Sequence, residues 1–355
     1  MEFVSWSLPW LLVTPYCCAR RCVGLLLMAL ITPCTAGPRR PRVMLDLRDN
    51  VATVTKHRYA QAYQAVQNWL WDNGFPPMGW LVSQSTAMVN EVLMMYIQYL
   101  YDEKRAYTHA PYTLAAIQHF HRSLHGQLRP AWQSVKTWRH AEPGELRAPI
   151  PLGVLWGLMA VALATRSSGM AALLALAYHC LLRPGELCRL TRRHLRLPGD
   201  SGWHAAVGMV VVTDPKTAKI AARVQHVVIH DKVVLALCRS SWGALPPGAR
   251  LGPTNTHELE KWFRWALKLL LLRENQFTPA GLRAGGATHD YLAGSPVERL
   301  MWRGRWAALT TLKHYVQECT SVLATASMPV ATQHRLANLE AMLVPYLDAL
   351  TGSWQ

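Results

Sequence analysis

The chain has few acidic residues and no cysteine spacing of the kind that holds a metal. Its 355 residues include 21 Asp or Glu against 37 Lys or Arg, which gives a formal net charge of +16. The eight cysteines contain no C-x-x-C pair with a matching second pair, so we predict no zinc site and no disulfide framework. The excess of basic side chains favours a polyanionic partner, because cations that neutralise phosphates release condensed counterions. A basic soluble protein without a nucleic-acid role would have the same composition.

The sequence also lacks a long apolar run. Near the N-terminus, Arg20 and Arg21 precede the ten apolar or small residues VGLLLMALIT, and Pro33 and small residues follow. A run of this length is too short for a membrane span but has the outline of a signal peptide. Three interpretations of residues 1–42 stay open: an organellar or secretory leader, a segment placed by a wrongly chosen start codon, and a short interfacial helix.

The next hundred residues predict a helical domain over 43–140. Apolar residues recur at helical spacing over 59–71, 88–101, 112–124 and around 131–138. The segment HAEPGELRAPIP, with three prolines and one glycine, predicts a linker over 141–151. The periodicity by itself fits a DNA-binding clamp and a generic helical bundle equally well.

The remainder predicts a second domain over 152–328 and a final helix within 329–355. Apolar helices are expected over 152–164 and 171–182, and longer helices over 254–272 and 279–293. Two β-rich runs, 208–213 and 224–229, flank a polar turn and predict a hairpin. The fold class is therefore α+β: mainly helical, with a small β-sheet or hairpin.

Five residues of this second domain could together form a site in which a tyrosine attacks a phosphodiester. Tyr315 follows Arg283 by 32 positions and Trp306 by nine, while Arg183 and Glu186 come from LLRPGEL after an apolar stretch. A phenol with a pKa near 10 is a weak nucleophile. Two guanidiniums can help it by holding the phosphate oxygens and neutralising charge as it builds. Taken singly, each of these residues is more often a core or surface residue.

Around these residues the sequence resembles the tyrosine recombinases of the phage integrase type. AYHCLLRPGELCRL is similar to the family's first box, GLRxxEL, through Arg183 and Glu186. TPAGLRAGGATHDYL is similar to the second box, TPHxLRxxxAT, through Arg283. RGRWAALTTLKHY is similar to the third box, LGHxxxxTTxxY, with Trp306 in the His/Trp position and Tyr315 in the position of the nucleophile. Boxes in this order and spacing are a specific signal.

The resemblance also implies a basic hairpin. The family carries a lysine in its β-hairpin, and DPKTAKIAARVQHVVI offers Lys216 for that place, with Lys219 as the rival candidate. Arg223 stands where a further basic residue usually follows. We expect Lys219 and Arg223 to contribute to DNA binding, and Glu186 to support Arg183 by orienting it.

One position departs from the family pattern. The second box has histidine three residues before its arginine, and here that residue is Ala280. The family's histidine is thought to contact the scissile phosphate, so its loss removes one donor. The departure leaves the nucleophile, both arginines and the lysine in place.

The resemblance implies a helical core-binding domain that clamps DNA and a catalytic domain that cleaves and rejoins strands. Tyr315 would attack the scissile phosphate to give a 3′-phosphotyrosyl link, and Lys216 would protonate the leaving 5′ oxygen. No metal and no small-molecule cofactor is implied, and the partner is double-stranded DNA. Two alternatives remain: a DNA-binding protein of this fold that has lost catalysis, and a nicking-closing enzyme like the type IB topoisomerases. The compartment stays open: nucleus or organelle in a eukaryote, cytoplasm in a prokaryote.

The C-terminal segment has two interpretations. A loose stretch is expected over 318–332. An amphipathic helix should follow it, with apolar residues at helical spacing: Leu336, Leu339, Leu343, Tyr346, Leu347 and Leu350. In the family, the last helix docks on a neighbouring protomer and links a tetramer on DNA, which is a heterologous contact that closes a ring. The alternative is a helix packed on its own domain.

Overall fold

The computed structural model describes residues 51–143, 148–213, 215 and 222–352. The chain divides into two compact units, Met1–Pro143 and Gly144–Gln355. The interpretations of residues 1–42 lie outside the described residues. No helix in the described ranges has both the length and the apolar character needed to cross a bilayer.

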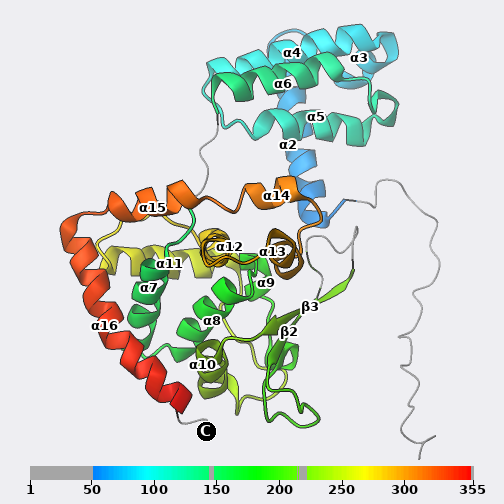
Figure 1. Ribbon diagram of the computed structural model, residues 1–355. Helices are drawn as coiled ribbons and strands as arrows, with labels where there is room; N and C mark the ends of the chain where they lie inside the picture. The colour runs from blue at the N-terminus through cyan, green and yellow to red at the C-terminus, as the bar shows by residue number, and fades with distance from the viewer. Residues whose placement is uncertain (1–50, 144–147, 214, 216–221, 353–355) are drawn as a thin grey trace, which may run out of the picture. The chain divides into compact units, whose positions relative to one another are not determined.

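The first unit is helical, as predicted. Its helices are α2 (Thr53–Asp72), α3 (Met78–Gln84), α4 (Thr86–Asp102), α5 (His109–Phe120) and α6 (Arg129–Ala141) (Figure 1). Helices α2 and α5 pack together, and α4 packs against α6. The buried side chains of this core include Leu70, Leu93, Leu114 and Ile117. Helix α3 was missed because the Asn, Gly and Pro residues before it indicate a break.

A buried asparagine joins two of these helices. Asn90, 5% exposed, donates from Nδ2 to the carbonyl oxygens of Thr86, at 2.9 Å, and Gln127, at 3.2 Å. Its Oδ1 accepts from the Ala131 N–H, at 3.3 Å, in the first turn of α6. First-turn N–H groups have no partner within their own helix, so Asn90 supplies one. The contact ties the start of α6 to α4.

The second unit carries a small sheet among helices. Its helices are α7 (Leu152–Ala164), α8 (Ser168–His179), α9 (Pro184–Leu187), α10 (Lys232–Trp242), α11 (Thr256–Leu269), α12 (Ala280–Leu292), α13 (Val297–Gly304), α14 (Leu309–Lys313), α15 (Glu318–Ala326) and α16 (Val330–Gly352). Strands β1 (Leu195–Arg196), β2 (Gly208–Thr213) and β3 (Val224–Ile229) form an antiparallel sheet in the order β1-β2-β3. The predicted α+β class, mainly helical with a small sheet, is confirmed.

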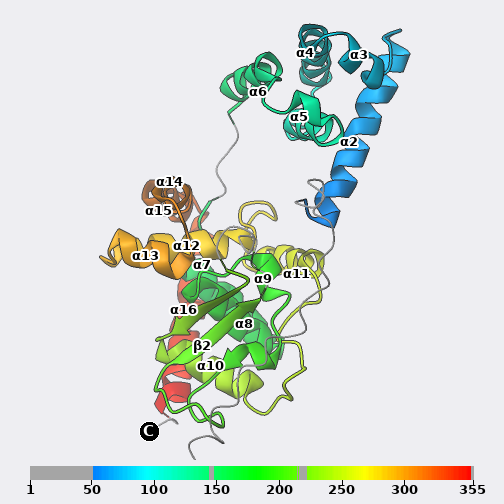
Figure 2. The same cartoon turned by 90° about the vertical axis from the view of Figure 1, so that its right-hand side faces the viewer.

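The predicted hairpin forms, with a third short strand beside it. In its register, Gly208 pairs with Ile229 and Thr213 pairs with Val224. Buried Val210 and Val227 belong to the same core as helices α8 and α10, beside which the sheet lies (Figure 2). Alternation of side chains along a strand leaves the other face exposed, as at Val228. Helix α10 was not predicted, although Asp231 caps its first turn by accepting from the Val234 N–H.

Helix α12 reaches the core through close backbone contacts. A Cβ at Gly285 would lie 2.1 Å from the Ile150 carbonyl oxygen, and one at Gly286 would lie 2.1 Å from the Tyr178 carbonyl oxygen. Only glycine allows such an approach without movement of the backbone. The glycines therefore set α12, which carries Arg283, directly against the end of α8.

The C-terminal helix packs on its own unit. Helix α16 runs along α7 and α10 (Figure 1), and Leu336, Leu343 and Leu347 are buried in the shared core. Leu336 lies so close to Gly157 of α7 that a Cβ there would be 2.6 Å from its Cδ2. Of the two interpretations of this helix, the structure has the one within the same domain. The expectation of a loose stretch over 318–332 was wrong, because α15 occupies Glu318–Ala326 and α16 begins at Val330.

Candidate active site

Arg183 and Glu186 meet at the turn that follows α8. Arg183 precedes Pro184, the first residue of α9, and its N–H donates to Glu186 Oε2 at 2.9 Å. Its Nη1 donates to Oε1 of the same carboxylate, also at 2.9 Å. These two bonds to one carboxylate orient the Arg183 guanidinium, whose side chain keeps 20% of its surface exposed while that of Glu186 keeps 1%. Burial raises the pKa of Glu186, but Arg305, the Arg183 N–H and the Arg183 guanidinium outweigh it, so the net pKa is lowered.

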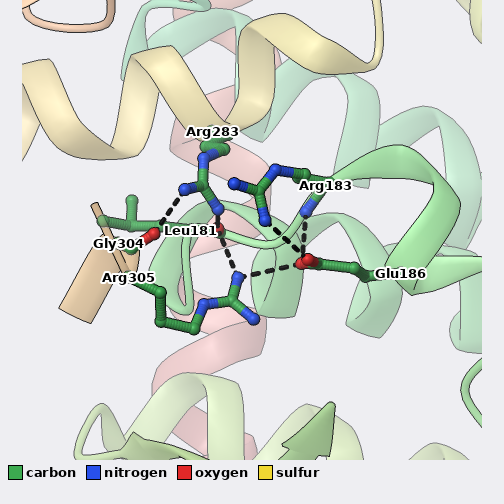
Figure 3. A network of polar contacts seen from close by, with 6 residues as sticks. All are labelled: Leu181, Arg183, Glu186, Arg283, Gly304 and Arg305. Atoms are coloured by element: carbon green, nitrogen blue, oxygen red, sulfur yellow. Dashed lines mark hydrogen bonds and ion pairs between the residues drawn. The ribbon is translucent and has the colours of Figure 1, made fainter. Parts of the chain in front are cut away.

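Arg283 enters the same place from α12, with only 1% of its surface exposed. Its Nη1 donates to the Leu181 carbonyl oxygen and its Nη2 to that of Gly304 (Figure 3). Its Nε has no hydrogen-bond partner among the described residues. Burial, followed by the charges of Arg183 and Arg305, lowers the pKa of Arg283. An anion at this guanidinium would offset both effects.

Trp306 and Tyr315 complete the site from the segment after α13. The Arg283 guanidinium carbon lies 4.5 Å from the centre of the Trp306 ring and 5.3 Å from that of Tyr315. The two rings are 4.9 Å apart between centroids. The indole Nε1 is buried and donates to no group in the described part of the chain. The predicted nucleophile therefore lies beside one predicted arginine of its own chain.

Hydrogen bonds hold the segment that carries Tyr315. The Thr288 hydroxyl of α12 donates to the Tyr315 carbonyl oxygen at 3.1 Å and accepts from the Gln317 N–H at 3.2 Å. Gly304 has to be glycine, because a Cβ there would lie 2.0 Å from the indole ring of Trp306. Thr288 belongs to the second box and Gly304 to the third, and both act here through packing and backbone contacts.

Sequence reasoning missed a third arginine, Arg305. Its side chain is 7% exposed, and its Nη2 donates to Glu186 Oε2 at 2.9 Å and to the Leu181 carbonyl oxygen at 3.2 Å. In the third box, the histidine of LGH corresponds to Trp306, so the glycine before it corresponds to Arg305. An arginine in place of this glycine was the signal in the sequence that could have indicated Arg305.

Three further residues were predicted for this site. Lys216 and Lys219 lie outside the described residues. Arg223 is exposed immediately before β3, and no contact joins it to the arginines in the described part of the chain. The structure thus brings together Arg183, Glu186, Arg283, Trp306 and Tyr315.

Ala280 begins α12, three residues before Arg283. It lines a cavity of about 310 Å³ together with Pro184, Thr278 and neighbours from α11. The Thr278 hydroxyl is buried and has no hydrogen-bond partner among the described residues.

The arrangement suits an anion with several oxygens. Three guanidiniums face one carboxylate, which leaves two positive charges in a largely buried place. Guanidiniums bind phosphate oxygens in forked pairs, and their attraction for an anion is stronger away from water. Within the described ranges, no group of three or more His, Cys, Asp or Glu side chains could hold a metal ion.

The comparison with known proteins agrees with this geometry at the level of fold. The solved integrase of transposon Tn1549, in complex with transposon right-end DNA, aligns over 79% of this chain and 94% of its own, with 15% identity and a TM-score of 0.57. The same integrase in complex with circular-intermediate DNA aligns over 77% and 98%, with 12% identity and a TM-score of 0.51. No protein-family model matches the sequence, and no curated protein matches it. The chain has the fold of the DNA integrases and recombinases that its sequence boxes resemble.

Proposed function

We propose that this protein cleaves and rejoins DNA strands through a 3′-phosphotyrosyl intermediate, as a site-specific recombinase. One observation carries the proposal. Tyr315 stands beside the buried Arg283, and Arg183 is bound to the same small network, in a place with two uncompensated positive charges. A surplus of buried guanidinium charge is costly unless an anion shares it. A phosphodiester is the anion that would also give the tyrosine something to attack.

The proposed roles follow from position. Tyr315 attacks the phosphorus atom, and Arg183 and Arg283 bind the non-bridging oxygens. Trp306 Nε1, which has no partner among the described residues, donates a further hydrogen bond. Lys216 protonates the 5′ oxygen as it leaves, and Lys219 and Arg223 bind the backbone nearby. The phosphodiester bond energy is kept in the tyrosyl ester, so a 5′-hydroxyl can reverse the step and complete strand exchange.

We further propose that double-stranded DNA is the partner. The Tn1549 integrase was solved with DNA, and the net charge of +16 favours a polyanion. In this proposal, residues 43–140 bind DNA as a clamp and residues 152–328 carry the chemistry. A tetramer on DNA stays a proposal, and because α16 packs on its own unit, it needs either release of α16 or another surface.

Two other functions fit parts of the geometry. A DNA-binding protein that has lost catalysis is favoured by Ala280, which supplies no donor to the phosphate. A nicking-closing enzyme would use the same arginines and tyrosine without joining two duplexes.

The test uses the full chain and duplexes with a randomised centre, each nicked close to the centre. Cleavage beside the nick releases a short fragment that is lost, so the covalent adduct cannot be reversed. We expect adducts that survive denaturation and whose DNA-bearing peptide contains Tyr315. DNA binding without any adduct would overturn the enzymatic proposal. Joining of strands from two duplexes supports recombination, whereas relaxation of supercoiled DNA without joining would favour the nicking-closing alternative.

A further inference from the structure

Arg305 has a backbone conformation that an arginine adopts only at a cost. It ends α13 with φ 58° and ψ 45°, in the left-handed region. Glycine adopts this conformation freely, whereas a side chain clashes with the following peptide. Contacts of the Arg305 side chain must therefore offset this cost.

Those contacts join Arg305 to both of the other arginines. Its Nη2 donates to Glu186 Oε2, while Arg183 takes Oε1 of the same carboxylate. The same Nη2 donates to the Leu181 carbonyl oxygen, which also accepts from Arg283. Figure 3 shows the three guanidiniums gathered around these two acceptors.

The charges explain what the arrangement does. Glu186 is 3% exposed, so its negative charge needs a partner inside the protein. Without Arg305, Arg183 alone would neutralise it, and the attraction of Arg183 for another anion would fall. With Arg305 present, two positive charges remain for the phosphodiester.

We propose that Arg305 is a positioning residue that holds Glu186 and the Leu181 carbonyl so that Arg183 and Arg283 stay available to the scissile phosphate. The inference rests on the proposed strand-cleavage function and adds to it a residue that acts through Glu186. Arg305 distinguishes this chain from the LGH pattern of the third box, in which glycine occupies the position of Arg305.

The test measures adduct formation on nicked duplexes by full-length Arg305→Asn, Glu186→Gln and the double variant. Asparagine tolerates the left-handed conformation and carries no charge, so the backbone is kept. We expect Arg305→Asn to slow adduct formation by roughly tenfold or more, with duplex affinity changed by less than about threefold. The double variant again has two net positive charges, and we expect it to react faster than Arg305→Asn. Additive losses in the double variant, or an unchanged Arg305→Asn, would overturn the role through Glu186.

The pH profile supplies a second readout. Glu186 faces the Arg183 guanidinium and N–H on one side and Arg305 on the other, with Arg283 across the Leu181 carbonyl. Loss of Arg305 raises the pKa of Glu186, so acid neutralises the carboxyl sooner and frees Arg183. The rate of Arg305→Asn relative to wild type should therefore rise as the pH falls. A pH-independent ratio would mean that Arg305 only supports the fold.

A matched control is Arg299→Asn, which removes one exposed arginine from the same helix. We expect its adduct rate to stay within about threefold of wild type, as for most exposed sites. A loss of adduct rate equal to that of Arg305→Asn would show that net charge alone is responsible and would overturn the proposal.

The wild-type protein distinguishes failure of this role from failure of the proposed function. Wild-type protein that forms no adduct overturns the strand-cleavage function together with this role. An adduct-forming wild type with an unaffected Arg305→Asn overturns the role alone.

Discussion

At the scale of single residues, the site depends on pairs of arginines that donate to the same hydrogen-bond acceptor. Glu186 is shared by Arg183 and Arg305, and the Leu181 carbonyl by Arg283 and Arg305. A change at one member alters the charge seen by the others, because neighbours in one network do not contribute additively. Effects of single substitutions here therefore have to be measured against matched variants.

Tyr315→Phe should abolish covalent attachment to DNA. Only the hydroxyl is removed, and the ring keeps its contacts with Trp306 and Arg283. We expect duplex affinity, measured by a mobility shift, to change by less than about threefold. Adducts that persist in this variant would show that another residue is the nucleophile.

Ala280→His should raise the cleavage rate in a wild-type background that cleaves. The residue starts α12 beside a cavity of about 310 Å³. In the proposed function, an imidazole at this position would add one donor to the phosphate. One donor of this kind can contribute on the order of a hundredfold. The measurement is single-turnover adduct formation, with Ala280→Asn as a control for added volume. A folded variant with no gain would mean that the position does not reach the phosphate.

At the scale of elements, two contacts of α8 set the geometry of the site. Its last turn meets Gly285 and Gly286 of α12, which places Arg283 beside Leu181. His179, its last residue, accepts from the His230 N–H at 3.3 Å and so ties the helix to the end of β3. Both contacts leave little freedom in how α12 and the sheet are placed.

Gly286→Ala should destabilise the fold. The new Cβ would meet the Tyr178 carbonyl oxygen at 2.1 Å, so α12 and α8 would have to separate. Overpacking of this kind costs about 1–3 kcal/mol in the free energy of unfolding. Gly153→Ala in α7 is the control, since no atom lies within 4 Å of its added Cβ. Urea unfolding in which both variants equal wild type would contradict the close packing.

His179 makes the free energy of unfolding depend on pH. Burial first, and then Arg303 and His230, lower its pKa to about 4, while Asp231 acts in the opposite direction. Between pH 6.5 and about 4 the unfolded chain binds a proton that the folded chain does not. Stability should therefore fall over this window on acidification, by roughly 3 kcal/mol. Urea unfolding at pH 7 and 5 should show a smaller loss in His179→Gln, and an equal loss would contradict the shift.

At the scale of the whole molecule, the chain forms two units with separate cores, and the second is closed by its own C-terminal helix. Buried Leu336, Leu343 and Leu347 place α16 in the same core as α7, α8 and α10. A helix that contributes this much to one core cannot leave without exposing apolar surface. Exchange between protomers through α16 therefore has a cost that a loosely attached helix would not have.

Leu343→Ala should lower the free energy of unfolding by about 2–5 kcal/mol, because it leaves a cavity in the core. Met342→Ala, next to it on the same helix, is the control, since Met342 is 75% exposed and Leu343 is 4% exposed. Equal and small changes in the free energy of unfolding, measured in urea, would show that α16 is not part of this core in solution.

Truncation after Pro329 should likewise give an unfolded or aggregated protein. A folded truncation that loses only cooperative assembly on DNA would support docking on a neighbour.

Much of the fold could be predicted from the sequence because its signals are local. The strands Gly208–Thr213 and Val224–Ile229 and the helix Leu152–Ala164 have the expected bounds, since alternation and apolar runs are set within each segment. The three boxes likewise indicated Arg183, Glu186, Arg283, Trp306 and Tyr315, because their spacing is visible along the chain. Helix α15 was missed, since none of its residues is buried and it carries no apolar face to detect.

The sequence by itself determined the fold class, the boxes and the excess of positive charge, all of which are properties of residues close together in the chain. Only the tertiary structure decided that α16 packs on its own unit, that Arg305 joins the arginine network, and that Tyr315 lies over Arg283. Each of these depends on side chains far apart in sequence that come within a few ångströms. Such contacts follow from how the helices pack, which no local pattern records.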